Sequence, residues 1–405
     1  MKDLRIGIIG GGAAGMVAAI TAAREGANVT IMEAGERMGQ KILSTGNGKC
    51  NLGNASLDAS QYHGSCAFMQ DALDKFGTKE SISFFESLGL YVKEKNGYLY
   101  PQSEQASAVL DVLRNEIAAL GIQVVTGFRV TKITKEKSFV VTVGSRELSF
   151  DRVILCCGGK AMPKTGSDGS GWDVAKKLGH TIVPVVPALT SLKCKETFFK
   201  AISGVRTDAS ITILGRNGEA LESERGELQL TDQGISGIPV FQISRTAAYL
   251  LKKQKEVPVV VDFLPAYSEE SLAKMAKDRM ALRHGRTMEE FFTGIFPKKV
   301  MSLLLKLEGV GHVSPADQLS ENDIRRVLES AKHFEVHVIA TGDFSNCQVC
   351  AGGIDCKEIK ESFESKLVPG LYFAGEILDV DGRCGGYNLQ WAWTSGYLAA
   401  KNAVG

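Results

Sequence analysis

The sequence predicts an α/β fold: a Rossmann-like dinucleotide-binding domain interrupted by an inserted antiparallel β-barrel-like domain and a helical subdomain. Three observations predict it. A strand, a glycine-rich turn and a helix open the chain; alternating segments with hairpin turns fill its middle; and a strand, a glycine-rich turn and a helix return at its end. The 405 residues, 44% of them hydrophobic and 23% charged, are typical of a globular chain of enzyme size.

The first part of the chain alternates strands and helices, as an α/β domain does. Residues 4–9 predict a short buried strand, 13–25 a helix with alanines on its packing face, and 28–33 a second strand. Further along, helical spacing covers 69–90, 104–120 and 172–179, and strand-like patterns cover 122–143 and 147–159.

The middle of the chain changes character after Pro184 and Pro187. Residues 207–231 alternate like antiparallel strands around an Asn217-Gly218 hairpin turn, and helix-capping signals dominate 268–333. Strands are predicted again at 334–341 and 371–374, and a final helix at 387–403. We therefore expect a dinucleotide-binding domain over 1–185 and 346–405, an inserted β domain over 186–266 and 334–345, and a helical subdomain over 267–333.

Charge and cysteine content limit the classes of partner and compartment. A net charge of +1 gives no electrostatic reason to expect a nucleic acid or an anionic membrane as partner. The apolar stretch from Ile6 to Ala23 resembles a signal peptide but is broken by Gly10-Gly11-Gly12, and no other run reaches the roughly 18 apolar residues that span a bilayer. Nine cysteines with no secreted spacing predict a reducing, cytoplasmic compartment. The Cys347-x-x-Cys350 pair lacks a second pair or a spaced histidine, so we expect no metal site.

The first motif is GIIGGGAAG at 7–15, between the first strand and the first helix. Gly10 permits the tight turn, Gly12 lets the backbone approach a pyrophosphate, and Gly15 lets helix and strand pack closely. Glu33 ends the second strand, where a carboxylate can accept hydrogen bonds from the hydroxyls of an adenosine ribose. The combination predicts dinucleotide binding; the alternative is a glycine-rich turn of an ordinary α/β protein.

The second motif, RMGQKILSTGNGKCNLGN at 37–54, favours FAD over NAD. A loop rich in amide donors and glycines suits a long diphosphate-ribityl ligand, whereas the alternative is a plain surface loop. Cys50 is the single cysteine in this loop, so a paired-cysteine redox site is not expected there.

Two more glycine-rich turns follow strands, at 153–180 and 370–402. Glu376 is placed to hydrogen-bond a ribityl hydroxyl. The helix that opens at Gly385-Gly386 offers free N–H groups to the anionic edge of a reduced flavin, with Asn388 as a first-turn contact. No catalytic residue is identified. The expected FAD contacts are Gly10, Gly12, Ala13, Ala14, Gly15, Glu33, Ala34, Gln40, Lys41, Gly46, Asn47, Gly48, Lys49, Cys50, Asn51, Val130, Cys157, Gly158, Gly375, Glu376, Gly386, Asn388 and Leu389.

The motifs together resemble a bacterial FAD-dependent flavoprotein family that includes a bile-acid-inducible enone reductase and aminoacetone oxidase relatives. The resemblance covers the full length and is carried by GGGAAG (10–15), KILSTGNGKCN (41–51), GGKAMPKTGSDGSG (158–171), GELQLTDQGISG (226–237), CAGGID (350–355) and LYFAGEILDVDGRCGGYNLQWAWTSG (371–396). It implies FAD and a flavin that faces the insertion, where substrate would sit. The family often has Thr-His where this chain has Thr231-Asp232, and Ser-Gly-Pro where it has Ser236-Gly237-Ile238-Pro239, so a histidine acid is not assumed here.

We expect an FAD-dependent oxidoreductase, in particular an NAD(P)H-fed reductase of a C=C bond conjugated to a carbonyl in a steroid- or bile-acid-like small molecule. No second G-x-G-x-x-G is present, so NAD(P)H would be a transient electron donor. Two alternatives stay open: an amine or amino-ketone oxidase that uses oxygen, and a flavoprotein with a non-catalytic RNA- or partner-binding role. The oligomeric state is left open as well.

Overall fold

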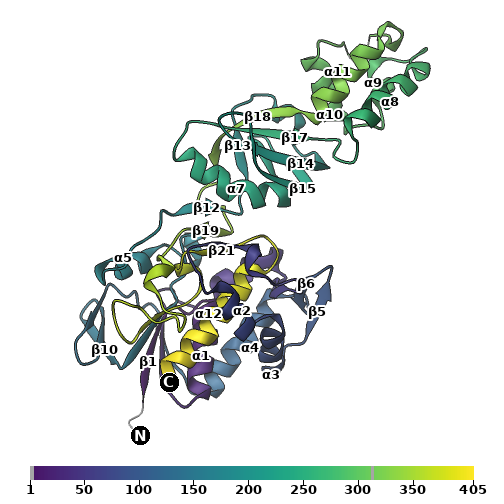
Figure 1. The fold of residues 1–405 in the computed structure, drawn as a ribbon. Coiled ribbons are helices and arrows are strands. Elements are labelled where there is room, and N and C mark those ends of the chain that lie inside the picture. Colours follow the sequence, from purple (N-terminus) through teal and green to yellow (C-terminus); the bar gives the residue numbers. More distant parts are fainter. Residues whose placement is uncertain (1–3, 312–313) are drawn as a thin grey trace. The chain divides into compact units, whose positions relative to one another are not determined.

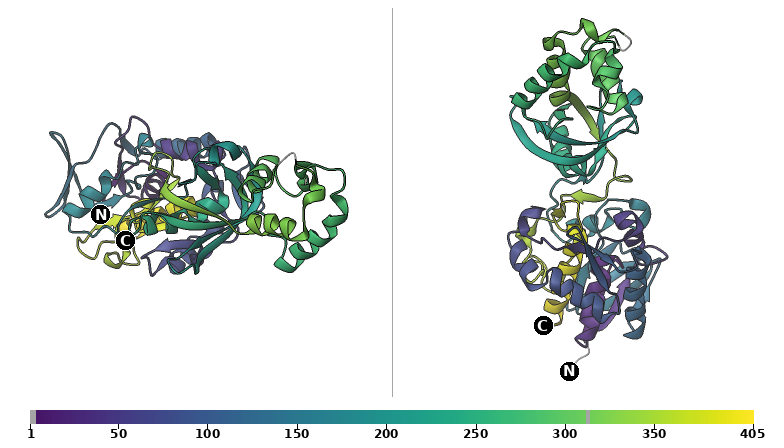
Figure 2. Two further views of the ribbon diagram at one scale, coloured as in Figure 1. Left: turned by 90° about the horizontal axis from the view of Figure 1, so that it is seen from above. Right: turned by 90° about the vertical axis from the view of Figure 1, so that its right-hand side faces the viewer.

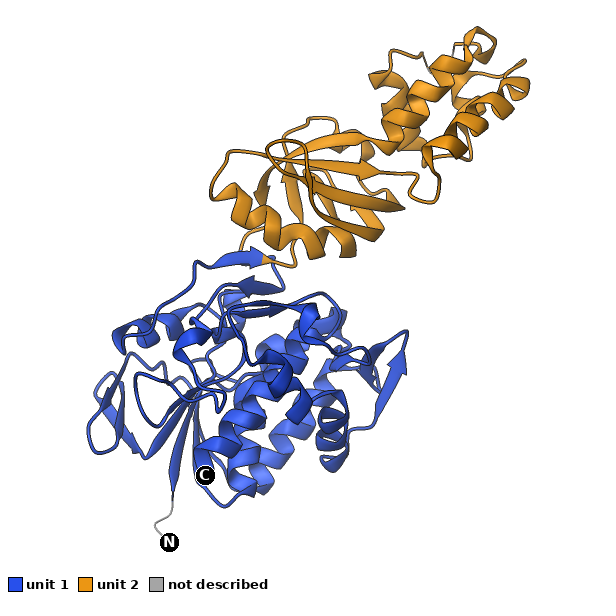
Figure 3. Cartoon of the chain, viewed as in Figure 1, with its two compact units in different colours: residues 1–187, 344–405 blue, residues 188–343 orange. Residues whose placement is uncertain are grey.

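The computed structural model describes residues 4–311 and 314–405 (Figures 1 and 2). The chain forms two compact units, residues 1–187 with 344–405 and residues 188–343 (Figure 3). The first unit contains a parallel sheet with helices, and the second contains a closed antiparallel barrel with helices. The predicted fold class is therefore confirmed.

The first unit is built on a five-stranded parallel sheet in the order β20-β11-β1-β2-β7. Its central strand is almost entirely buried, because helices or other segments cover both faces of a parallel sheet. This explains the continuous apolar run at the start of the sequence. The strands are β1 (Arg5–Ile9), β2 (Asn28–Met32), β7 (Gln123–Val125), β11 (Arg152–Leu155) and β20 (Leu371–Phe373).

Two helices from opposite ends of the chain, α1 (Ala13–Arg24) and α12 (Tyr387–Val404), lie side by side (Figure 1). They approach closely where Gly396 meets α1, since a Cβ atom at Gly396 would lie 2.5 Å from the carbonyl oxygen of Ala14. The small residues of α1 therefore serve this contact, and they hold the C-terminal helix against the N-terminal motif.

The remaining elements of the first unit are short. The helical spacing over 69–90 corresponds to two helices rather than one, because the backbone between them is extended at Phe76 (φ −147°, ψ 81°) and Gly77 (φ −100°, ψ −153°). Residues Val186–Ala188 form a short strand although Pro187 lies within it. The helices are α2 (Met69–Lys75), α3 (Thr78–Ser87), α4 (Ala106–Ala119) and α5 (Ser170–Lys177). The strands are β3 (Gly53–Asn54), β4 (Tyr62–Gly64), β5 (Val92–Lys95), β6 (Tyr98–Pro101), β8 (Lys132–Lys135), β9 (Phe139–Val143), β10 (Arg146–Phe150), β12 (Val186–Ala188), β19 (Val349–Ala351) and β21 (Val380–Gly382).

The second unit is a closed six-stranded antiparallel barrel in the order β13-β16-β15-β14-β17-β18. Alternate residues of β14 and β17 are buried, as strands with one face on a core require. The predicted turn at Asn217-Gly218 is confirmed, and Gly218 has the positive φ of +80° that favours glycine. The strands are β13 (Leu192–Cys194), β14 (Arg206–Leu214), β15 (Ala220–Leu230), β16 (Gly234–Gly237), β17 (Val257–Asp262) and β18 (Phe334–Thr341).

Three helices of the second unit begin where the capping signals predict. The side chains of Ser268, Thr287 and Ser320 each accept a hydrogen bond from a backbone N–H in the first turn. These helices share one hydrophobic core with the barrel strands, and their separation as a subdomain over 267–333 stays a prediction. No helix within residues 4–311 and 314–405 is long and apolar enough to cross a membrane. The helices are α6 (Phe199–Ile202), α7 (Ile238–Leu251), α8 (Glu269–Arg279), α9 (Met288–Phe292), α10 (Lys298–Leu307) and α11 (Glu321–Lys332).

Candidate functional site

Of the three glycines in the G-x-G-x-x-G spacing after β1, the fold needs Gly10 and Gly15 but not Gly12. A Cβ at Gly10 would lie 2.4 Å from the Cys156 oxygen, and a Cβ at Gly15 would lie 1.9 Å from the Gly10 oxygen. Gly12 differs, because its φ of −82° suits any residue and no atom lies within 4 Å of an added Cβ. Gly12 thus leaves open space in front of α1, where the backbone of a dinucleotide-binding motif approaches its ligand.

The start of α1 offers the groups that a nucleotide diphosphate and ribose require. No side chain caps this helix N-terminus at Gly12, and Ala13, Ala14 and Gly15 form its first turn. The buried Glu33 lies beside it: its Oε2 accepts a hydrogen bond from Gly11 N at 2.8 Å, and its Oε1 accepts one from Gly35 N at 2.7 Å. A carboxylate accepts about four hydrogen bonds, so two positions remain for ribose hydroxyls. The residues present therefore fit the adenosine diphosphate end of FAD.

Other predicted residues gather around Glu33. Phe128 N donates to the backbone carbonyl oxygen of Glu33 at 2.8 Å, so the segment that leads to the buried Val130 runs beside Glu33, which precedes the half-buried Ala34. Cys157, followed by Gly158, lies at the end of β11 with its Sγ 3.5 Å from the oxygen of Ile9. Burial, and secondly the nearby Glu33 carboxylate, raise the pKa of the Cys157 thiol to about 12. This thiol therefore contributes packing rather than thiolate chemistry.

Glu33→Gln is expected to weaken FAD binding by roughly tenfold, because the new amide NH₂ would face the N–H of Gly11 or Gly35 in place of an acceptor. Titration of the FAD-free protein with FAD, followed by flavin fluorescence, measures this. Glu36→Gln is the control, since Glu36 is exposed three residues further on. Equal FAD affinities of the two variants would show that the Glu33 carboxylate does not contact the cofactor.

The predicted FAD loop at 37–54 folds into an irregular 3-10 segment, Gln40–Gly48. Left-handed backbone conformations occur at Gly46, Asn47, Gly48 and Cys50, which explains why the loop is so rich in glycine. The exposed side of the loop carries Lys49. Cys50, in contrast, is fully buried, and burial raises the pKa of its thiol to about 12.

An ion pair joins the loop at 37–54 to the glycine-rich segment at 370–402, across 335 residues of sequence. In this pair Lys41 Nζ lies 2.6 Å from Glu376 Oε2. Glu376 Oε1 accepts a hydrogen bond from Cys350 N at 2.8 Å. Close approach is built in, because a Cβ at Gly159 would lie 3.1 Å from the Glu376 carboxyl carbon. The expected bond from Glu376 to a ribityl hydroxyl stays a prediction, and the carboxylate has lone pairs left for it.

The start of α12 is held by side chains of the FAD loop. With its side-chain amide oriented so that both ends form hydrogen bonds, Asn51 accepts a hydrogen bond from Gly386 N at 3.2 Å. The amide nitrogen donates one to the Gly53 oxygen at 2.8 Å. Asn54 Nδ2 donates to Gly385 O at 3.0 Å. Gly386 has a φ of +95° and provides no side-chain cap, so the helix N-terminus is shaped to present backbone N–H groups.

The side chain of Asn388 is engaged within the protein, and its contact with the cofactor stays a prediction. Its Oδ1 accepts from Gly382 N at 2.8 Å and its Nδ2 donates to Gly382 O at 2.7 Å, so its side chain fastens α12 to β21. A cofactor contact from Asn388 would therefore come from its backbone. The neighbouring Leu389 is half-buried. Gly375, with a φ of +81°, donates its N–H to Ser395 Oγ at 2.8 Å and lies against Ala14.

Cys350 lies in this region although it is not among the expected FAD contacts. A hydrogen bond with Cys347, and secondly burial, hold the pKa of the Cys350 thiol far above its usual value. Two buried cysteines of which Cys350 keeps its proton are typical of packing rather than of metal binding. Within residues 4–311 and 314–405, no group of three His, Cys, Asp or Glu side chains could hold a metal ion. Cys350 belongs to the CAGGID motif at 350–355, but the carboxylate that accepts from its backbone N–H, Glu376, lies in the segment 370–402. The sequence therefore does not reveal that the two residues meet.

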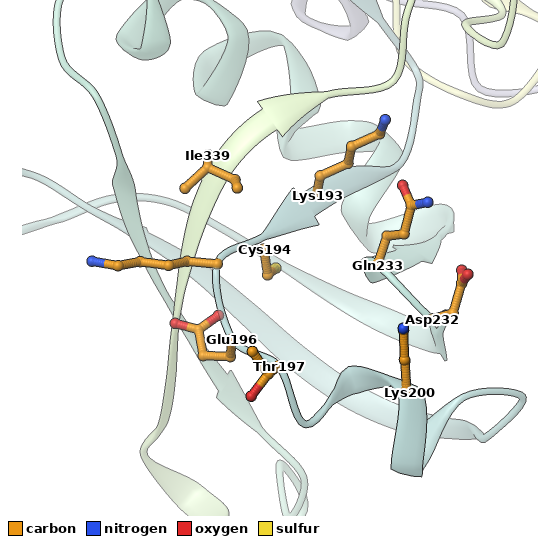
Figure 4. Close-up of a pocket in the computed structure, with 9 residues that line it drawn as sticks. Lys193, Cys194, Glu196, Thr197, Lys200, Asp232, Gln233 and Ile339 are labelled. Carbon is orange, nitrogen blue, oxygen red and sulfur yellow. The ribbon is translucent and has the colours of Figure 1, made fainter.

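The second unit contains a cavity of about 430 Å³ at the β13 side of its barrel (Figure 4). Asp232 and Gln233, from the loop after β15, form part of its wall. This is the loop where the chain departs from the Thr-His pair of the family it resembles. The departure therefore changes the lining of a cavity and not only a surface turn.

Comparison with known proteins extends the resemblance. The family model described as HI0933-like protein Rossmann domain matches residues 4–402. The 3-dehydro-bile acid delta(4,6)-reductase of Clostridium scindens is 47% identical over 406 residues, covering 99% of each chain. The ribosomal RNA dihydrouridine synthase of Haemophilus influenzae is 30% identical, covering 97% of this chain and 96% of that one. A solved 3-ketosteroid-delta4-(5alpha)-dehydrogenase from Rhodococcus jostii shares the fold, with a TM-score of 0.50 at 14% identity over 100% of this chain and 97% of that one.

Proposed function

Because the chain belongs to the HI0933-like protein family, we propose that it is an FAD-dependent reductase of a carbon–carbon double bond conjugated to a carbonyl group. One observation carries this proposal: the 47% identity to a 3-dehydro-bile acid delta(4,6)-reductase extends over 99% of both chains. The substrate we propose is an enone of a bile-acid-like or steroid-like ring system. The oxidase and non-catalytic alternatives have no comparable support.

The residues that would hold FAD come from four parts of the first unit. The N-terminus of α1 and Glu33 fit the diphosphate and the adenosine ribose. The Lys41–Glu376 pair and the N-terminus of α12 fit the ribityl and ring portions. When bound, FAD supplies hydride transfer, which no side chain of the chain provides. The partial positive charge at the start of α12 favours negative charge next to it.

We propose NADH or NADPH as the electron donor. The sequence contains a single G-x-G-x-x-G motif, so a nicotinamide nucleotide has no second binding domain and would bind only transiently. A small-molecule substrate and a cytoplasmic location belong to the same proposal. The protonated thiols of the buried Cys50 and the half-buried Cys157 suit a reducing compartment.

The proposal is tested by anaerobic spectroscopy of the purified yellow protein. NADH or NADPH is expected to bleach the flavin absorbance, and a 3-oxo-delta-4 bile acid is expected to restore it while the product gains two mass units. An amine and oxygen are the control additions. Bleaching by the amine, hydrogen peroxide formation in air and no reoxidation by the enone would instead establish an oxidase.

A second candidate substrate is favoured by the relative named ribosomal RNA dihydrouridine synthase, at 30% identity. The C5=C6 bond of uracil is conjugated to a carbonyl, so forming dihydrouridine is the same class of reduction. The net charge of +1 disfavours it, because affinity for RNA depends on neutralising phosphates. Incubation of the NADPH-reduced protein with uridine-containing ribosomal RNA, followed by nucleoside mass spectrometry, decides between the substrates.

A further inference from the structure

The glycine-rich motif GGKAMPKTGSDGSG at 158–171 forms a closed loop that reaches Glu33. Gly169 N donates to the Gly159 oxygen at 2.9 Å, which brings the two ends of the loop together. Further along the loop, a Cβ at Gly166 would lie 3.6 Å from Glu33 Oε1. The loop therefore borders the carboxylate that fits the adenosine ribose, although the expected FAD contacts include only the first residue of the loop.

A charged pair fixes the loop at this place. Asp168 accepts a hydrogen bond from the guanidinium of Arg129 through one oxygen, and its other oxygen accepts from Ser170 N at 3.0 Å. Burial, and then the carboxylates of Glu33 and Asp168, raise the pKa of the Cys157 thiol to about 12. Glu33, Cys157 and Asp168 therefore lie close together, and the conformation of the loop around them is determined by the protein itself.

The side chain of Ser167 lies within this fixed loop and has no hydrogen-bond partner in the protein. Ser167 is 6% exposed, and within residues 4–311 and 314–405 its Oγ forms no hydrogen bond. A Cβ at Gly158 would lie 2.9 Å from Ser167 Oγ, so the glycine leaves room for the hydroxyl. Buried hydroxyl groups without a partner are destabilising and rare in native proteins. The Ser167 hydroxyl therefore indicates a polar group of a ligand beside it.

We propose that Ser167 binds the adenosine half of FAD, with its hydroxyl hydrogen-bonded to the ribose or the adenine. The proposal rests on the proposed function, in which FAD is the cofactor, and adds a binding residue to that site. Ser167 directly follows Gly166, which lies against Glu33. The competing assignment is the flavin half, because Gly159 at the start of the loop lies against Glu376.

The test compares Ser167→Ala with the wild type by calorimetric titration of the FAD-free protein with FAD and with ADP. ADP contains the adenosine and two phosphates but no flavin. The affinities for FAD and for ADP are both expected to fall about threefold to tenfold, which is the usual contribution of one hydrogen bond. Ser145→Ala is the matched control, because Ser145 is exposed between β9 and β10, and it is expected to leave both affinities within twofold.

The melting temperature of the FAD-free protein gives a second readout that needs neither ligand nor turnover. Ser167→Ala removes a buried hydroxyl without a partner, so this temperature is expected to stay the same or to rise. The further rise on adding a fixed concentration of FAD is expected to be smaller than in the wild type, since stabilisation by a ligand follows its affinity. A purely structural serine would give a lower melting temperature and unchanged affinities.

The outcomes separate this proposal from the proposed function. If Ser167→Ala binds FAD and ADP as the wild type does, the assignment of Ser167 is wrong while the reductase stands. If only the affinity for FAD falls, the hydroxyl faces the flavin half and the assignment is wrong as well. If the wild type binds FAD and ADP but no enone reoxidises the flavin, the reductase is wrong, and the two titrations still decide the role of Ser167.

Discussion

Gly12→Ala is expected to give a folded protein that loses most of its FAD. The added methyl group meets no atom of the chain within 4 Å, and the φ of −82° needs no glycine, so the fold loses little. The space it fills lies at the start of α1, where we expect the FAD diphosphate. Overpacking costs about 1–3 kcal/mol, which is roughly tenfold to a hundredfold in FAD affinity.

The measurement is the ratio of flavin absorbance to protein after gel filtration, together with the melting temperature of the FAD-free protein. Gly15→Ala is the contrasting variant, because its Cβ would lie 1.9 Å from the Gly10 oxygen and backbone would have to move. We expect Gly15→Ala to fold poorly and Gly12→Ala to melt as the FAD-free wild type does. A Gly12→Ala protein with full FAD content would place the diphosphate elsewhere.

The second large effect is expected from Trp393, which is fully buried on α12. Its Nε1 donates to the Leu52 oxygen at 2.9 Å, and its ring lies edge-on to Phe85 at 5.1 Å. Trp393→Phe leaves the buried Leu52 carbonyl without this donor, and we expect the free energy of unfolding to fall by about 2–4 kcal/mol from lost packing and hydrogen bonding. The buried indole thus holds the FAD loop against the C-terminal helix.

Trp391→Phe is the matched control on the same helix. Trp391 is as deeply buried, but within the described residues its Nε1 has no hydrogen-bond partner, so its replacement removes an unsatisfied donor. We expect urea unfolding, followed by tryptophan fluorescence, to show Trp391→Phe more stable than Trp393→Phe by about 1–3 kcal/mol. Equal midpoints would mean that the Trp393–Leu52 hydrogen bond contributes no net stability.

Local sequence patterns predicted those elements whose conformation is set by residues adjacent in sequence. The β-α-β start, the Asn217-Gly218 turn and the helix caps at Ser268, Thr287 and Ser320 all follow from nearest neighbours. The apolar spacing over 69–90 did not reveal that this segment forms two helices, because the break is an extended backbone at Phe76 and Gly77 and not a change in the apolar pattern.

The sequence by itself determined the family, the fold class and the glycine-rich turns, because each depends on backbone conformations that a few adjacent residues dictate. The tertiary structure alone decided which distant groups meet. It joined Lys41 to Glu376 across 335 residues and directed the Asn388 side chain to Gly382. The physical reason is that a side chain's hydrogen bonds and charge balance depend on neighbours in space, and only the packed sheet and barrel bring those neighbours together.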